Sequence, residues 1–171
     1  MESFESDRII YRDITLDDTE KVLKWRNCDE VRKNFFYQVI ITEQEHIEYY
    51  KTRIAVGETR QFVMIDKASE MEFGCVYLSH IDLKAGTAEE GIFIGEDTFR
   101  GSGYGTEAYR WLKEFGFKEL GLNSICLRIR KENIASKKSA KNAGFIIDQR
   151  LVDKYYEDGG TEDLIFLSDH K

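Results

Sequence analysis

Apolar and polar residues alternate along the chain in patterns that predict an α/β fold. Period-two alternation, or a short apolar run between turn residues, predicts seven strands, at 8–12, 62–65, 73–81, 88–94, 125–130, 145–147 and 164–167. Apolar residues at helical spacing predict four helices, at 16–26, 43–55, 108–120 and 133–144. The order β-α-α-β-β-β-α-β-α-β-β indicates a single α/β domain over residues 1–171, with a mixed, mostly antiparallel sheet.

Capping residues support the first two helices and leave an irregular segment between them. Thr15 stands before the acidic first turn of one helix, and Thr42 with Glu45 forms a capping box at the start of the next. The segment 25–41 is polar and then aromatic, which is typical of a shaped loop or a broken helix. The turn at 157–160 separates the last two predicted strands.

Composition and charge narrow the classes of protein that the chain can belong to. Twenty-five Lys and Arg against 32 Asp and Glu give a net charge of −7, which argues against a nucleic-acid or anionic-lipid partner. The three cysteines are far apart and form no zinc motif with the three histidines, so we expect reduced thiols and no metal. Residues 1–7 lack the features of a secretory leader, and no apolar run reaches the roughly 20 residues of a membrane span. The sequence therefore predicts a cytoplasmic protein and leaves its oligomeric state open, with a homodimer as one option.

The glycine-rich segment from Arg100 to Thr106 lies between a predicted strand and a strong helix. Glycines at such a junction let the backbone approach a ligand, and the N–H groups at a helix N-terminus bind anions. The segment is no Walker loop, because no Gly-Lys-Ser/Thr occurs in the sequence. Its spacing also differs from the dinucleotide fingerprint, and the preceding strands are predicted to be antiparallel.

Three motifs in order resemble the GCN5-related N-acetyltransferase (GNAT) family. Arg100-x-x-Gly103-x-Gly105 resembles the family's R/Q-x-x-G-x-G/A signature, and Ala88-Glu89 has the spacing of an Ala-Glu pair on the central strand of several members. The segments 133–136 and 142–145 resemble the N-x-A-S and K-x-G-F elements. The resemblance covers nearly the whole chain, and the predicted order of elements is also that of the family.

The resemblance implies an enzyme that transfers acetyl from acetyl-CoA to a primary amine, on a protein N-terminus or a small molecule. The segments 25–27, 35–37, 45–46 and 155–159, the last taken as a hairpin, resemble the branch that acetylates ribosomal-protein N-termini. The first and third of these also resemble acetyltransferases of nucleotide-linked amino sugars, so that acceptor class stays open. A non-catalytic acyl-CoA-binding regulatory module and a nucleotide-binding structural protein are the rivals from other classes.

The resemblance also implies which residues hold the acetyl donor. The loop would bind the diphosphate, and Asn133 would bond the pantetheine arm or cap the helix that follows it. Ser136, one turn later, would lie near the thioester sulfur, with a plain exposed helix serine as the alternative. Backbone N–H groups at the strand end would stabilise the oxyanion. The expected donor-binding residues are Phe93, Ile94, Arg100, Gly101, Ser102, Gly103, Tyr104, Gly105, Thr106, Asn133 and Ser136.

Two adjacent glutamates compete for the role of general base. Alternation along the strand places Glu89 and Glu90 on opposite faces of the sheet. Glu89 lies eleven residues before Arg100, where members that use a strand glutamate have it, so Glu89 is the favoured base. An ordinary cross-strand ion pair is the alternative role for this residue.

The general acid is harder to assign, because the tyrosine that the family often uses is missing. Its position, seven residues after Asn133, is occupied by Ala140. Ser136, a tyrosine such as Tyr155, or water would then deliver the proton. Because a thiol has a pKa near 8.5, a dedicated acid helps but is not essential.

Five residues are expected on the acceptor side, each with a structural alternative. They are Trp25, Arg26, Phe36, His46 and His80. His46 belongs to the predicted second helix, where a structural role is the simpler interpretation. His80 ends a strand where it could serve as a base or relay, although a surface histidine is the simpler interpretation.

Overall fold

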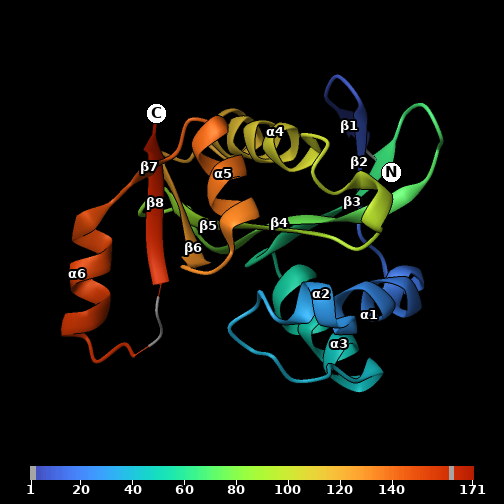
Figure 1. Ribbon diagram of the computed structural model, residues 1–171, viewed down its shortest axis with the longest axis horizontal. Helices are drawn as coiled ribbons and strands as arrows, with labels where there is room; N and C mark the ends of the chain where they lie inside the picture. Colours follow the sequence, from blue (N-terminus) through green and yellow to red (C-terminus); the bar gives the residue numbers. More distant parts are fainter. Residues whose placement is uncertain (1–2, 162–163) are drawn as a thin grey trace.

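The computed structural model describes residues 3–161 and 164–171, and its centre is one eight-stranded mixed sheet (Figure 1). The order across the sheet is β1-β2-β3-β4-β5-β6-β8-β7, and of these pairs only β5 with β6 is parallel. The strands are β1 Ser3–Glu5, β2 Ile9–Asp13, β3 Arg60–Asp66, β4 Glu72–Asp82, β5 Thr87–Ile94, β6 Ser124–Arg130, β7 Ile146–Ile147 and β8 Leu164–His170. The predicted α/β class and mixed, mostly antiparallel sheet are confirmed.

Helices cover both faces of this sheet (Figure 1). They are α1 Thr19–Asn27, α2 Asp29–Arg32, α3 Glu43–Tyr49, α4 Tyr104–Lys118, α5 Ile134–Asn142 and α6 Gln149–Glu157. Helices α4 and α5 lie on one face, α1 to α3 lie on the other, and α6 packs at the β8 end of the sheet. A π-helical segment, Tyr50–Ile54, continues α3, so the predicted helix over 43–55 is present in two parts.

Strand alternation divides the buried side chains between two cores. On β3, Phe62 and Met64 pack against α4, whereas Val63 points to the opposite face and packs with Trp25 of α1. The α4 side carries the larger cluster, which includes Leu112, Phe115 and the stacked pair Tyr11–Trp111. Burial on both faces fixes the register of the central strands, because a slip of one residue would exchange the two sets.

The sequence analysis predicted seven strands and four helices and missed three elements: β1, the short α2 and α6. Strand β1 pairs antiparallel with β2, and its three residues are too few to show an alternating pattern. The expected hairpin at 155–159 is wrong: Tyr155 belongs to α6. Asp148 caps this helix by accepting from the backbone N–H of Arg150, and one apolar face including Tyr155 packs against Phe166 of β8.

The β5–β6 pair is short, and this shapes the molecule around its centre. Only Thr87, Ala88 and Glu89 pair with β6, although β5 continues to Ile94. Beyond Glu89 the β6-side edge of β5 has no strand partner among the described residues. The two strands therefore diverge at Glu89, and a space opens between them in the middle of the sheet.

Candidate active site

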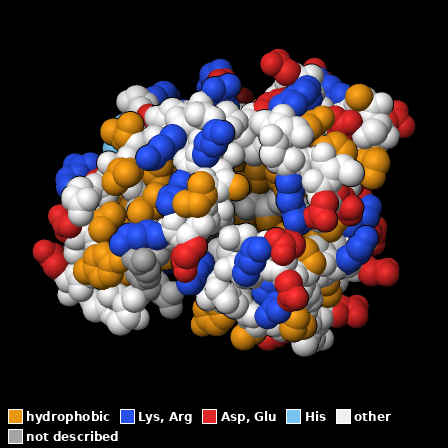
Figure 2. Space-filling view, in the orientation of Figure 1, with side chains coloured by type: hydrophobic (Ala, Val, Ile, Leu, Met, Phe, Trp, Pro, Cys, Tyr) orange, Lys and Arg blue, Asp and Glu red, His pale blue; other side chains and the backbone are white. Residues whose placement is uncertain are grey.

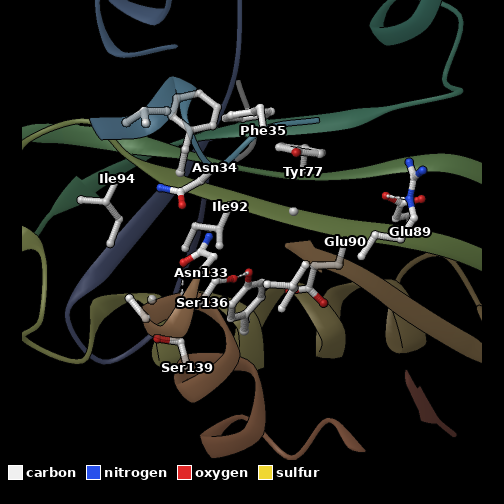
Figure 3. Close-up of a pocket in the computed structure, with 18 of the residues that line it drawn as sticks. Asn34, Phe35, Tyr77, Glu89, Glu90, Ile92, Ile94, Asn133, Ser136 and Ser139 are labelled. Carbon is white, nitrogen blue, oxygen red and sulfur yellow. Dashed lines mark hydrogen bonds and ion pairs between the residues drawn. The ribbon is translucent and has the colours of Figure 1, made fainter. Parts of the chain in front are cut away.

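A pocket of about 1100 Å³ occupies the space where β5 and β6 diverge (Figures 2 and 3). Its lining comes from β5, from the loop 100–106, from the first turns of α4 and α5, and from the segment after α2. Elements that are distant in the sequence thus meet at one point. The space-filling view shows the hollow between the α4–α5 half and the α1–α3 half of the molecule.

The loop before α4 leaves its backbone open to a ligand. Gly101 and Gly103 have φ values of +76° and +87°, which L-residues with a side chain rarely adopt. Within the described residues, no atom lies within 4 Å of where a Cβ of Gly101 would be. The N–H groups at the start of the 15-residue helix α4 follow directly, so the loop and helix N-terminus form a site for an anion.

Arg100 ties this loop to the end of β5. Its guanidinium donates to the carbonyl oxygens of Ile94 at 3.0 Å and Gly95 at 3.2 Å, and it forms an ion pair with Asp97 at 2.6 Å. Arg100 also lines the pocket. The side chain therefore fixes the loop on the strand end, in addition to placing positive charge beside the anion site.

Most of the expected donor-binding residues lie together in the pocket, and two do not. Ser102 and Tyr104 are absent from the lining. The Ser102 carbonyl accepts from Arg8, and the Tyr104 hydroxyl donates to Asp66 at 2.7 Å. The remaining nine all line it: Phe93, Ile94, Arg100, Gly101, Gly103, Gly105, Thr106, Asn133 and Ser136.

The first turn of α5 presents polar groups to the same space. Asn133 caps the helix, because its side-chain oxygen accepts from the backbone N–H of Ser136 at 3.1 Å. The Ser136 hydroxyl lies 2.9 Å from the hydroxyl of Tyr109, which α4 contributes to the lining. Figure 3 shows Asn133 and Ser136 side by side at the start of α5. Burial raises the pKa of Tyr109 above its usual value near 10, so this phenol stays protonated.

Glu89 lies where β5 and β6 diverge, and its carboxylate is close to two basic side chains, those of Arg128 and His80. Its carboxylate accepts from Arg128 Nε at 2.8 Å and lies 3.7 Å from His80 Nδ1. Arg128 in turn lies over the ring of Phe36, 4.9 Å from its centroid. His80 has a φ of +51°, an uncommon backbone conformation for a residue with a Cβ. All four residues line the pocket.

Glu90 also reaches the pocket, from the opposite face of β5 (Figure 3). Glu90 is only 3% exposed, and neither of its carboxyl oxygens has a hydrogen-bond partner among the described residues. Burial raises the pKa of Glu90 well above its usual range, with a smaller opposite effect from Lys113. Burial therefore favours the neutral form of Glu90, whereas Glu89 is ion-paired.

Four residues expected at the site do not line the pocket. Trp25 is buried and donates from its indole to Glu96 at 2.7 Å, and Arg26 packs over Phe35 and donates to the carbonyl of Tyr37. His46 is buried in α3, and Tyr155 belongs to α6. Arg26 thus supports the segment after α2, whereas Trp25 holds the chain just after β5. Phe36 and His80 do reach the pocket.

The structure adds residues that the sequence analysis did not select. Tyr109, Arg128 and Tyr77 all line the pocket. Tyr77 packs so closely on Gly91 that a Cβ there would lie 2.3 Å from its ring. Neither residue type nor spacing singled these residues out: Arg128 lies on the half-exposed face of β6, where an arginine is usually an ordinary surface group, and Tyr109 belongs to the buried face of α4.

Comparison with known proteins agrees with the fold. The family described as an acetyltransferase (GNAT) domain matches residues 8–146. An uncharacterized N-acetyltransferase of Bacillus licheniformis is 25% identical over 98% of this chain and 96% of its own length. A putative ribosomal N-acetyltransferase of Bacillus subtilis (strain 168) is 30% identical over 56% of this chain and 51% of its own.

The fold is also that of a solved enzyme. The structure of spermidine N-acetyltransferase from Vibrio cholerae, in complex with CoA and spermine, superimposes with a TM-score of 0.82 over 96% of each chain, at 21% identity. The mixed sheet that diverges at its centre, together with the match to the family model, defines an acyltransferase of the GNAT type. The chain belongs to the GNAT acetyltransferase family and is an N-acetyltransferase.

The residues present fit acetyl-CoA, the co-substrate that this family uses. The open glycine loop and the N-terminus of α4 suit a diphosphate, and Asn133 and Ser136 border the path from there toward Glu89. Over residues 3–161 and 164–171, no three His, Cys, Asp or Glu side chains gather as a metal site. No helix in that part of the chain is long and apolar enough to cross a membrane.

Proposed function

We propose that the protein transfers acetyl directly from acetyl-CoA to a primary amine, on a protein N-terminus or on a small molecule. One observation carries the proposal: the anion-binding loop and Glu89 line the same continuous pocket, so that donor and acceptor can be bound together. Holding two reactants in position supplies much of the rate advantage of such an enzyme.

Direct transfer is favoured over a covalent acetyl-cysteine because no thiol is placed for attack. None of the three cysteines lines the pocket. Burial raises the pKa of Cys75 to about 12 and that of Cys126 to about 11, which keeps both thiols protonated. The amine is then the group that attacks the thioester.

Glu89 is the proposed general base. An amine is protonated at neutral pH and must lose a proton before it attacks, either to the carboxylate or through a water. Arg128 and His80 hold the carboxylate at the point where β5 and β6 diverge. The unpaired edge of β5 beyond Glu89 supplies backbone N–H groups for the oxyanion, which fits the expected role of the segment at Phe93 and Ile94.

The acceptor class rests on the names of relatives, which include a putative ribosomal N-acetyltransferase and a spermidine N-acetyltransferase. Measuring CoA release and acetylated product over a panel tests the proposal: ribosomal N-terminal peptides, polyamines and amino-sugar nucleotides. We expect one class to give thiol and acetyl-amine in equal amounts, and its N-acetylated form to give none. Tight CoA binding without turnover of any class would instead indicate a non-catalytic acyl-CoA-binding module.

A further inference from the structure

The departing sulfur of CoA needs a proton, and the residue that most often supplies it in this family is replaced. Ala140 stands at that position, is fully buried in the core and offers no hydroxyl. Three other groups capable of donating a proton lie on the same side of the pocket: Ser136 from α5, Tyr109 from α4 and Glu90 from β5.

Ser136 and Tyr109 form a fixed pair. Their hydroxyl oxygens are 2.9 Å apart, and Tyr109 is only 3% exposed. The Asn133 cap holds the backbone of Ser136, and the Tyr109 ring packs against Phe145. When the tyrosine donates to the serine oxygen, the serine hydrogen is free to donate into the pocket.

Glu90 is the carboxyl group behind this pair. It interacts electrostatically with Tyr109, and its two oxygens are buried without a partner among the described residues. The titratable groups that face it are Tyr11 on β2 and Tyr109 and Lys113 on α4. The Lys113 ammonium is engaged elsewhere, with Asp169 at 2.6 Å and the carbonyl of Ala143 at 2.8 Å.

We infer that the leaving thiolate receives its proton from Glu90 through Tyr109 and Ser136. This inference rests on the proposed acetyl transfer. When the C–S bond of the tetrahedral intermediate breaks, sulfur keeps the electron pair and takes the Ser136 hydroxyl proton. Ser136 is refilled from Tyr109, and the Glu90 carboxyl, which lines the same pocket, returns the proton to Tyr109. Glu90 is left as a carboxylate, which regains a proton from solvent.

The order of acidities explains why all three groups are needed. Tyr109 alone is too weak an acid to give its proton outright to a thiolate, whose conjugate thiol has a pKa near 8.5. The Glu90 carboxyl, whose pKa is raised by burial, carries a proton that it can return to the pair. Ser136 contacts the reacting sulfur, whereas Tyr109 and Glu90 act through it.

The first test measures CoA affinity by calorimetry from about pH 7 to about pH 10, across the thiol titration. Donation by Ser136 stabilises the bound thiolate, so wild-type affinity should rise with pH relative to desulfo-CoA. In Tyr109→Phe and Ser136→Ala, the increase in CoA affinity between these pH values should be smaller by about three- to tenfold. A tenfold difference corresponds to a shift of about one unit in the pKa of the bound thiol. Ser136→Thr should restore it. Tyr11→Phe, which removes another buried hydroxyl near Glu90 but outside the pocket, should leave it unchanged.

The second test measures acetyl transfer by Glu90→Gln, which keeps the size of the side chain but cannot pass on a proton. Turnover should fall by about tenfold or more at neutral pH, and the loss should shrink above the thiol pKa, where the thiolate needs no proton. CoA affinity near pH 7 should not change. An equal loss at every pH, or wild-type turnover, would overturn the role of Glu90.

The two tests separate this inference from the proposed function. The CoA titration needs no acceptor, so identical pH dependence in wild type and Tyr109→Phe would overturn the hydroxyl chain even in an active enzyme. A protein that shows the expected titration but acetylates no amine would contradict the proposed function and still support a thiolate-binding pair at Ser136.

Discussion

The two sides of the pocket are held in place by different kinds of contact. On the donor side, which comprises residues 100–106 and the first turns of α4 and α5, polar groups that line the pocket are fixed by neighbours in the sequence: Arg100 binds the carbonyl of Ile94, and Asn133 binds the N–H of Ser136. Long-range contacts with Arg8 and Asp66 hold Ser102 and Tyr104, which do not line the pocket. On the acceptor side, which comprises Glu89 with His80, Arg128 and Phe36, the contacts join different strands and a loop.

This difference decides which side a sequence reveals. A loop and helix N-terminus need particular residues at fixed spacing, so the donor side can be recognised from a sequence motif. The pairing of Glu89 with Arg128 depends instead on two strands that are 39 residues apart in the sequence. The same dependence on surroundings gives the adjacent residues Glu89 and Glu90 different environments, an ion pair for Glu89 and burial without a hydrogen-bond partner among the described residues for Glu90. Variants that act on one side only can test how separate the two sides are.

The largest effect is expected for Glu89→Gln on the acceptor side. The amide keeps the shape and hydrogen bonding of the carboxylate but cannot accept the amine proton, so turnover should fall by about 10²–10⁴-fold, or about 3–5 kcal/mol of barrier. CoA affinity should stay within a few-fold, and the loss should shrink at high pH, where solvent deprotonates the amine. Steady-state kinetics and calorimetry on the same preparation measure both.

A second carboxylate with two cationic partners provides the control. Glu72 pairs with Arg12 and Lys21 but lies outside the pocket. Glu72→Gln should keep wild-type turnover, although it breaks comparable ion pairs. Wild-type turnover in Glu89→Gln would remove this residue as base, and a similar loss in both variants would indicate a general defect of the sheet.

On the donor side, Gly103→Val should abolish measurable CoA binding, with affinity reduced by about 100-fold or more, about 3 kcal/mol. The side chain would cover the backbone N–H groups that face the diphosphate, at a φ of +87°. Gly121→Val carries a similar backbone strain at φ +68° outside the pocket and serves as the control. Equal CoA affinity in a folded Gly103→Val protein and in wild type would contradict the role of the loop.

Most of the fold follows from the sequence because its signals are local and repeated. Alternation in 62–65 or 125–130 and the helical spacing of 108–120 each predict an element that the structure contains. The prediction for the α6 segment was wrong for a physical reason. The pair Gly159–Gly160 was interpreted as a hairpin turn, but it follows the end of a helix, where the N–H of Gly160 donates to the carbonyl of Tyr155.

The site was predictable only where residue type and spacing were sufficient. The motif placed nine donor-side residues in the pocket but not the side chains of Ser102 and Tyr104, because a backbone-binding loop leaves alternate side chains free to pack elsewhere. Tyr109 carries no motif, and its relation to Ser136 exists only after α4 and α5 pack together. His46 was selected because it follows Glu45 in a segment that resembles the family, but its side chain is buried in α3 and does not line the pocket.

A smaller effect is expected from Glu90→Gln on stability. Burial raises the pKa of Glu90 in the folded protein, so the folded state binds this proton more tightly than the unfolded chain. Stability is therefore lost as the pH rises from about 4.3, the unfolded value, toward the folded pKa. The neutral amide escapes this loss. Glu90→Gln should melt at a higher temperature than wild type near neutral pH, and the gap should close as the pH falls to about 4. A constant gap would show that Glu90 is not held protonated by burial.

The smallest effect is expected at His80, where the acceptor side carries backbone strain. A glycine adopts the φ of +51° freely, so His80→Gly should stabilise the fold by at most about 1 kcal/mol. The lost ion pair offsets little, because the imidazole is 73% exposed. Glu70, with a φ of +58° in the turn after β3, is the matched control outside the pocket. Chemical denaturation should show similar gains for Glu70→Gly and His80→Gly, whereas only His80→Gly should lower turnover. The register of the β4–β5 pair shifts between Ser79 and Asp82, next to His80. Equal turnover in both variants would mean that the backbone strain at His80 results from this shift alone and does not affect the acceptor site.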